Sequence, residues 1–232
     1  PLEILYLEQH NDGTGQVWQN HYAEFAKFVK KFKEGGNILE IGGAHDWVFR
    51  RYQELDPNVR WTIVEPNPQH IENPHIKVLK AWFDDKFTLQ EPIDTIVHSH
   101  VFEHTFDPAK FIEHIGKFLK PGGRHIFAFP NFLPMLQNKQ TNCLNFEHTV
   151  FLPEHFTEYL LNKNGFRILG KQYYGDPHSI FYATEKSKNP LPAAALTNKY
   201  DEYKAMFMDF VHYHIEMIKD LNQKIQSSPH PT

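Results

Sequence analysis

Cysteine is nearly absent from this chain of 232 residues, since Cys143 is the only one. A single cysteine forms no intrachain disulfide and cannot supply the cysteine pairs of a structural zinc site. Long apolar runs are missing too, because no stretch approaches 18 consecutive apolar residues. The first ten residues also lack the basic-then-apolar pattern of a signal peptide. We therefore expect a soluble, cytoplasmic protein with no membrane partner.

An excess of positive charge is likewise absent. The 24 Lys and Arg residues face 28 Asp and Glu residues, which gives a net charge of −4. Proteins held to nucleic acid by bulk electrostatics need the opposite balance, so we expect no nucleic-acid partner. Apolar residues are plentiful instead, at 41% of the chain with 20 phenylalanines. That content allows a sizeable buried core and argues against a mainly disordered chain.

Short apolar runs alternate with amphipathic stretches over most of the chain. The amphipathic stretches predict helices at 16–32, 47–55, 109–119 and 154–163. The apolar runs predict strands at 37–41, 60–64, 75–79, 93–98, 124–129, 166–172 and 179–184. Strands separated by helices form a mostly parallel sheet through right-handed crossovers. We therefore predict an α/β fold with a doubly wound, mostly parallel, seven-stranded Rossmann-like sheet and helices on both faces.

The breaker-rich stretch SKNPLPAAALTN divides the chain near its C-terminal end. We expect one domain over 1–186, with an N-terminal helix at 16–32 and a core at 37–184. A linker at 187–199 then precedes a C-terminal helix at 200–226, whose apolar residues recur every three to four positions. This helix could pack over the sheet as an extra layer, cover a substrate pocket, or form the contact of a homodimer.

In doubly wound sheets, ligands bind beyond the carboxyl ends of the strands. The first strand ends in Glu40-Ile41-Gly42-Gly43-Ala44, and small residues there let a ligand approach the backbone amides. The loop lacks the GxxxxGK[ST] spacing of a phosphate loop, and Ala44 breaks the dinucleotide pattern GxGxxG. An NAD-dependent oxidoreductase is therefore disfavoured. Taken alone, the loop could also be an ordinary tight turn.

The next two strand ends carry side chains that suit a nucleoside. Glu65 ends the second strand, where a carboxylate can accept hydrogen bonds from both ribose hydroxyls. Phe83 and Asp84 follow the third strand and offer an aromatic face and an acceptor to an adenine ring. Each position also has a structural alternative, as a solvated acid or a core aromatic. The three strand ends together predict a nucleoside-binding mouth.

The succession LEIGG, VEPN, WFDD, DTIVHSHVFEHTFDP and LKPGGRHIFAFPN resembles the class I S-adenosylmethionine-dependent methyltransferases over about 37–184. The resemblance implies S-adenosyl-L-methionine as the cofactor and S-adenosyl-L-homocysteine as its product. It also implies a set of cofactor-binding residues: Glu40, Gly42 and Gly43 for the methionine part, Glu65 for the ribose, Phe83 and Asp84 for the adenine, and Ser99 and His100 for the sulfonium end. Ala44 and Asp46 stand where the family commonly has glycine, which leaves open a different loop path and weaker donor binding.

After the fifth strand, the segment NCLNFEHTVF resembles the YHEH segment of the sugar C-methyltransferases. That resemblance implies that Glu147 binds the acceptor and that His148 removes its proton, with Asn145 in place of the tyrosine. His104, beside Glu103, is a second candidate base. Either pair could instead be structural, as a loop salt bridge or a helix cap. No HExxH motif is present, and we expect no metal.

The resemblance therefore implies a methyltransferase that acts on a small polar acceptor. A sugar- or nucleotide-linked building block of a capsule or natural product is the expected class, including phosphoramidate-type modifications. O-methylation is at least as well supported as C-methylation, because the chain shows no cysteine-rich zinc module. The alternative is a catalytically inactive fold of the same type that binds nucleosides or serves as a scaffold.

Overall fold

The computed structural model describes residues 14–69, 73–145, 147–192 and 194–228. Within them, seven strands form one sheet in the order β3-β2-β1-β4-β5-β7-β6. The strands are β1 (Asn37–Ile41), β2 (Arg60–Glu65), β3 (Ile76–Lys80), β4 (Ile93–Ser99), β5 (Leu119–Pro130), β6 (Phe166–Tyr174) and β7 (Ser179–Lys186). β7 is antiparallel to both β5 and β6, and the other strand pairs are parallel. The predicted mostly parallel, seven-stranded sheet is confirmed.

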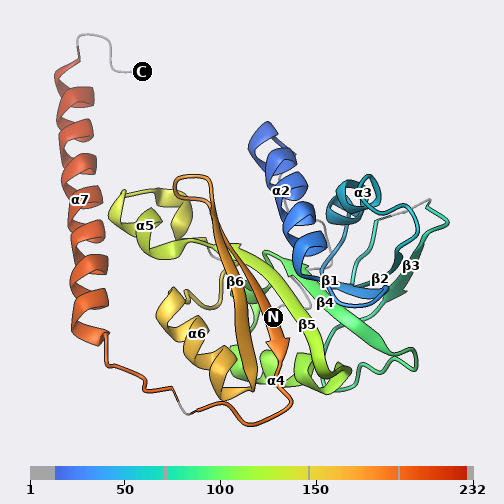
Figure 1. Cartoon of the computed structure of the whole chain (residues 1–232). Coiled ribbons are helices and arrows are strands. Elements are labelled where there is room, and N and C mark those ends of the chain that lie inside the picture. Colours follow the sequence, from blue (N-terminus) through green and yellow to red (C-terminus); the bar gives the residue numbers. More distant parts are fainter. Residues whose placement is uncertain (1–13, 70–72, 146, 193, 229–232) are drawn as a thin grey trace.

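Helices cover both faces of this sheet (Figure 1). On one face lie α2 (Gln16–Phe32) and α3 (Trp47–Gln53), and on the other lie α4 (Pro108–Phe118) and α6 (Glu154–Lys163). Successive strand residues alternate between the faces, so Ile38 packs with the first pair of helices and Leu39 with the second. Both faces are therefore buried, which explains the nearly continuous apolar runs of the strands.

The main boundary that differs from expectation is the start of β5. The sequence predicts a helix to residue 119 and a strand from 124, whereas β5 already begins at Leu119 and its register against β4 shifts near Ile93. Gly122 has a φ of 92°, which lets the backbone follow this irregular path. The short helices α5 (Phe132–Gln137), η1 (Phe102–His104) and η2 (Thr141–Cys143) were not predicted, because such short elements carry no readable periodicity.

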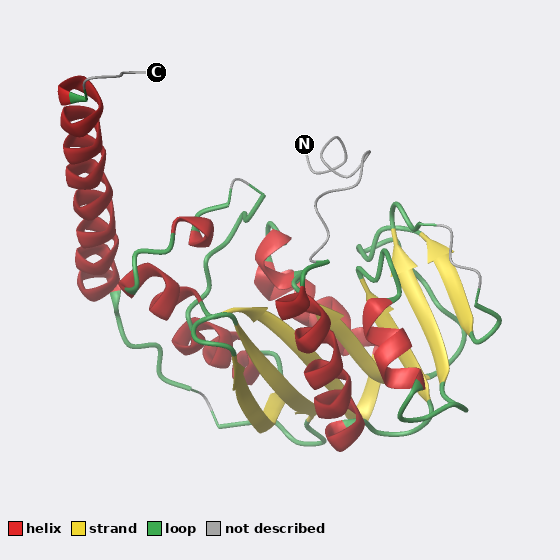
Figure 2. Cartoon of the chain, turned by 90° about the horizontal axis from the view of Figure 1, so that it is seen from above, coloured by secondary structure: helices red, strands yellow, loops and turns green. Residues whose placement is uncertain are grey.

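The C-terminal helix α7 (Tyr200–Ser227) stands beside the sheet domain instead of lying on it (Figure 2). It packs mainly on α5, where Phe210 is buried against Met135 and Leu136. The alternative of an extra layer over the sheet is therefore wrong, because Phe210 is the one described α7 residue that is buried. Its remaining apolar stripe is exposed, and the homodimer contact stays a prediction. None of the described helices combines the length and the apolar character needed to cross a membrane.

Candidate active site

One cavity of about 1180 Å³ opens at the carboxyl ends of the strands, where the strand order reverses between β1 and β4. A pocket for a single small ligand commonly measures about 300–1,000 Å³, so this cavity has room for two reactants. Its lining includes every candidate residue that the sequence indicated: Glu40, Gly42, Gly43, Glu65, Phe83, Asp84, Ser99, His100, His104, Glu147 and His148. The sheet therefore brings together residues more than one hundred positions apart.

The turn after β1 depends on its two glycines. Gly42 has a φ of 78°, and a Cβ there would lie 2.5 Å from a methyl group of Val101. A Cβ at Gly43 would lie 2.8 Å from the carboxyl carbon of Glu40. Larger residues would therefore collide with the cavity wall, and the glycines leave main-chain atoms exposed to a ligand.

Asp46, the departure from the family's glycine pattern, takes up the conformation that a glycine would supply. Its φ of 51° and ψ of 21° place it in the left-handed region at the N-terminus of α3. Its carboxylate is buried and accepts a hydrogen bond from Arg50 Nε at 2.7 Å. The side chain is thus held by α3, and the loop enters this helix without a third glycine.

Glu40 is the acid closest to the glycine turn. It is 3% exposed, and Trp61 Nε1 donates a hydrogen bond to its Oε2 at 2.7 Å. Burial raises the pKa of Glu40 to about 8, with smaller contributions from Asp46 and Glu65 in the same direction. A cationic ammonium group in the cavity would favour the ionised form of this carboxylate.

Glu65 ends β2 and is also buried, with 7% of its surface exposed. The Asn67 N–H donates to its Oε1 at 2.9 Å, which fixes the side chain. Burial raises the pKa of Glu65, although the Asn67 hydrogen bond opposes the shift. A carboxylate oriented in this way can accept hydrogen bonds from a vicinal diol such as that of ribose.

Phe83 and Asp84 line the same cavity after β3. The Phe83 ring packs against His114 and Phe118, with centroid distances of 4.7 and 5.4 Å. The Asp84 carboxylate accepts a hydrogen bond from the Lys86 N–H at 3.0 Å. An aromatic wall beside a polar rim is a suitable environment for a flat heterocycle.

Ser99 and His100 lie at the end of β4, between the two halves of the sheet. The Ser99 Oγ is buried and has no hydrogen-bond partner among the described residues. The His100 ring is held on both sides, because Nδ1 lies 3.0 Å from Glu103 Oε1 and Nε2 lies 2.9 Å from Ser179 Oγ. A carboxylate only accepts, so Nδ1 of His100 carries the proton and Nε2 accepts from the serine hydroxyl.

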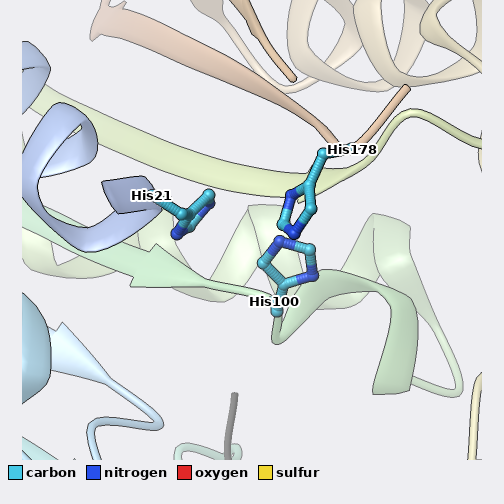
Figure 3. A group of neighbouring side chains, drawn as sticks. All are labelled: His21, His100 and His178. Carbon is cyan, nitrogen blue, oxygen red and sulfur yellow. The ribbon is translucent and has the colours of Figure 1, made fainter. Parts of the chain in front are cut away.

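His100 also belongs to a group of three histidines that the sequence did not indicate, which we call the His21 cluster (His21, His100 and His178). Their rings point toward one another from α2, from the loop after β4 and from the turn before β7 (Figure 3). One nitrogen of each lies within 4.8 Å of the others. Burial, reinforced by the neighbouring histidines, lowers the pKa of His21 to about 2 and that of His178 to about 4.

A second group, the Glu103 cluster (Glu103, His104 and His148), lies on the opposite side of His100. Its ligand-type atoms are also within 4.8 Å of one another. The main-chain carbonyl of Glu103 accepts hydrogen bonds from the N–H groups of Thr149 and Val150, at 2.9 and 3.2 Å. These bonds hold the loop that carries His148 against η1, although the two segments are about 45 positions apart.

The carboxylate that lies in one group with His148 is that of Glu103, whereas the resemblance implied only that Glu147 binds the acceptor. Burial lowers the pKa of His148, and the charge of Glu103 opposes this shift more strongly than that of Glu147. Glu147 contributes its main-chain carbonyl, which accepts a hydrogen bond from His104 Nδ1 at 3.1 Å. The expected helix-capping role falls to Asp107, whose side chain accepts from the Lys110 N–H at 3.0 Å.

Trp18 and His178 are further cavity residues that sequence reasoning missed. The Trp18 ring lies 4.8 Å from the ring of His100 and 4.7 Å from that of His178. Both come from segments outside the strand ends, and no motif marks them. A single aromatic residue on an amphipathic helix gives no signal that separates it from core residues.

Comparison with known proteins assigns this sequence to a family. A family model described as a methyltransferase domain matches residues 16–170, which is more than half of the chain. The chain belongs to this methyltransferase family. No protein with a curated description matches the sequence.

Solved structures share the fold at low sequence identity. The N-methyltransferase NodS from Bradyrhizobium japonicum WM9, in complex with S-adenosylhomocysteine, is similar with a TM-score of 0.58 and 17% identity, over 79% of this chain and 97% of that chain. The methyltransferase solved with the Haloferax volcanii Trm112 activator gives a TM-score of 0.61 and 13% identity, over 76% and 95%. The mitomycin 7-O-methyltransferase MmcR gives 0.57 and 16%, over 75% and 55%. Identities this low show the fold alone.

S-Adenosylmethionine is the cofactor that this family membership assigns to the chain. The residues present fit it: the glycine turn leaves space beside the backbone, and Glu40 offers a carboxylate to an amino-acid tail. Glu65 offers a second buried carboxylate, of a kind that can accept hydrogen bonds from a sugar diol, and Phe83 adds an aromatic ring to the cavity lining. The chain is thus an S-adenosylmethionine-dependent methyltransferase, and its acceptor is a separate question.

Proposed function

We propose that this methyltransferase transfers a methyl group to a hydroxyl oxygen of a small polar acceptor, which is sugar- or nucleotide-linked. The observation that carries the proposal is the two-sided cavity. Donor-type residues follow β1, β2 and β3 on one side, and the Glu103 cluster lies on the other. The resemblance of the segment around His148 to sugar C-methyltransferases supports the acceptor class, as a capsule or natural-product building block or a phosphoramidate-type unit.

One set of residues binds and aligns the donor, and another binds and activates the acceptor. Glu40 and the glycine turn hold the amino-acid tail of the donor, Glu65 its ribose, and Phe83 with Asp84 its adenine. Ser99 and His100 border the sulfonium end of the donor, which carries the methyl group to be transferred. The Glu103 cluster then binds the acceptor and weakens its O–H bond, so that the oxygen is aligned with the methyl carbon and the leaving sulfur.

The test combines turnover with donor binding. The protein is incubated with methyl-labelled S-adenosylmethionine and a panel of sugar nucleotides, and S-adenosylhomocysteine release is measured. We expect His148→Ala to lower turnover by about 10²–10⁴-fold, the range typical of proton transfer in catalysis. Its affinity for S-adenosylhomocysteine should stay close to that of the wild type, and the exposed His75→Ala serves as the matched control.

The alternatives give different results in the same assay. An inactive nucleoside-binding scaffold would bind S-adenosylhomocysteine, but it would form none from S-adenosylmethionine with any acceptor of the panel. Carbon methylation would appear in the NMR spectrum of the product as a C–CH3 signal in place of an O–CH3 signal. Undiminished turnover in His148→Ala would remove the Glu103 cluster from the reaction.

A further inference from the structure

The Glu103 cluster combines three side chains of the types that bind metal ions. A carboxylate and two imidazoles present one ligand atom each within 4.8 Å of one another, and all three residues line the cavity. Two ligands that lie about 2.1 Å from a shared ion are roughly 3 to 3.5 Å apart. Small side-chain rotations would therefore close this group around an ion.

The buried carboxylate of Glu103 has one oxygen for which the described part of the chain supplies no hydrogen bond. Glu103 is 5% exposed, and its Oε1 lies 3.0 Å from His100 Nδ1. Its Oε2 is buried without any hydrogen-bond partner among the described residues. An unsatisfied buried carboxylate oxygen is costly, and a cation at this position would remove the cost.

His104 is oriented as metal-ligating histidines usually are. His104 Nδ1 donates to the carbonyl oxygen of Glu147 at 3.1 Å, so the lone pair of this ring is on Nε2. A main-chain carbonyl behind a ligating imidazole is a common outer partner in metal sites, because it fixes the tautomer and the ring orientation. The backbone of the His148 loop is held on η1 by the main-chain bonds from Thr149 and Val150 to Glu103.

We propose that Glu103, His104 and His148 bind a divalent first-row transition-metal ion that holds the acceptor oxygen during methyl transfer. Two imidazoles and one carboxylate suit zinc, manganese, iron or cobalt and leave coordination positions open. This proposal rests on the proposed function and replaces the sequence expectation that no metal is bound. It also assigns the lone pair of His148 to coordination.

The positive charge of the ion acidifies the acceptor hydroxyl, whose proton leaves to water in the open cavity. The oxygen then forms a bond to the methyl carbon with its own electron pair. The carbon–sulfur bond breaks, and its electron pair remains on the sulfur. The products are a methyl ether, S-adenosylhomocysteine and the released proton, so the step needs no oxidant or reductant.

The His21 cluster fits an ion less well. Both ring nitrogens of His100 are already hydrogen-bonded, to Glu103 and to Ser179, and His178 Nδ1 lies 2.6 Å from the same serine oxygen. His21 is fully buried and does not line the cavity. This group also lacks a carboxylate to balance the charge of a cation. An ion there would have to break the bond between His100 and Ser179.

The test is a titration of EDTA-treated, full-length protein with Co²⁺, followed by calorimetry and by the visible d–d absorption of the bound ion. We expect about one ion per chain, and we expect His148→Ala and Glu103→Gln each to weaken Co²⁺ binding at least about tenfold. His178→Ala, which removes a ligand of the other cluster, should leave Co²⁺ affinity within about twofold. Circular dichroism tests whether each variant is folded. If His148→Ala is not folded, the conclusion is drawn from Glu103→Gln.

S-Adenosylhomocysteine binding is measured on the same samples, which separates this proposal from the proposed function. Normal S-adenosylhomocysteine binding without any Co²⁺, Mn²⁺ or Zn²⁺ binding would overturn the metal site alone. Loss of metal binding in His178→Ala, with His148→Ala unaffected, would place the ion in the His21 cluster and overturn the proposal. Loss of turnover after EDTA treatment, restored by Mn²⁺ or Co²⁺, would support it.

Discussion

The two walls of the cavity are built in different ways. The donor wall consists of residues at the ends of the adjacent parallel strands β1, β2 and β3, whose register sets their positions. The acceptor wall consists of η1 and the loop around His148, with the turn before β7 nearby, and long-range hydrogen bonds join the first two of these segments. The strand ends that the sequence predicts thus define one wall and leave the other open.

Because of this difference, substitutions in the two walls have different consequences for the fold. Changing the donor wall means changing a strand end, which also disturbs the sheet. Changing the acceptor wall means changing η1 and the loop around His148, which lie outside the strands of the sheet. A fixed donor site beside an adjustable acceptor site suits a fold that serves many acceptors.

The largest expected effect is on the donor wall. Glu65→Ala removes the acceptor of two ribose hydrogen bonds, each worth about 1.5–3 kcal/mol when made to a charged group. We expect S-adenosylhomocysteine to bind at least about 100-fold more weakly, measured by calorimetry. Glu91→Ala, which removes an exposed glutamate far from the cavity, is the control, and equal affinities in the two variants would contradict the donor wall described here.

On the acceptor wall, the comparison is between two glutamates. Glu103→Gln keeps the shape of the side chain but removes the buried charge beside His148, and we expect turnover to fall by about 10- to 100-fold. Glu147→Gln should lower turnover less, because the main-chain carbonyl of Glu147 makes the hydrogen bond to His104. A larger loss in Glu147→Gln, measured at saturating donor, would restore the role that the sequence suggested for its carboxylate.

Donor binding should depend on pH through Glu40. Its pKa of about 8 means that the carboxyl is mostly protonated at pH 6, and it must ionise to hold an ammonium group. Affinity for S-adenosylhomocysteine should therefore rise about tenfold per pH unit between pH 6 and 7. Glu40→Gln should remove this rise, and a wild-type affinity that stays flat over the same range would show that Glu40 already binds in its ionised form.

The same shift has a consequence for stability. The folded-state pKa of Glu40 lies above the unfolded value of 4.5. The contribution of this group to the free energy of unfolding is therefore fully present below pH 4.5 and is lost as the pH rises through about 8. In the absence of donor, Glu40→Gln should flatten this part of the unfolding free-energy profile, measured with urea. A steeper profile in the variant would contradict the assigned pKa.

The smallest effect is expected where α7 meets α5. Phe210→Ala removes the buried contact with Met135 and Leu136, so α5 should lose protection in hydrogen exchange. S-Adenosylhomocysteine affinity should stay within about twofold, because the described apolar cluster around Phe210 includes no residue of β1, β2 or β3. The exposed Tyr213→Ala on the same helix serves as the control. Protection changes spread over β1 and β2 would show that the two walls are coupled.

Sequence reasoning reached the donor wall because strand ends follow from hydrophobic patterning. Glu40 and Glu65 could be placed from the apolar runs that precede them, and Gly42 from the small residues that follow. The pairing of Glu103 with His148 could not be predicted, since it depends on hydrogen bonds across about 45 positions. His21 and His178 come together only through the packing of α2 on β7, and no motif marks this packing.

The most direct test of the account is a crystal structure of the protein with S-adenosylhomocysteine. We expect the adenine beside Phe83, the ribose on Glu65 and the amino-acid tail at the glycine turn. The sulfur should face His100 and the Glu103 cluster. An empty cavity at saturating ligand, or a ligand whose sulfur points away from the Glu103 cluster, would contradict the arrangement of donor and acceptor walls described here.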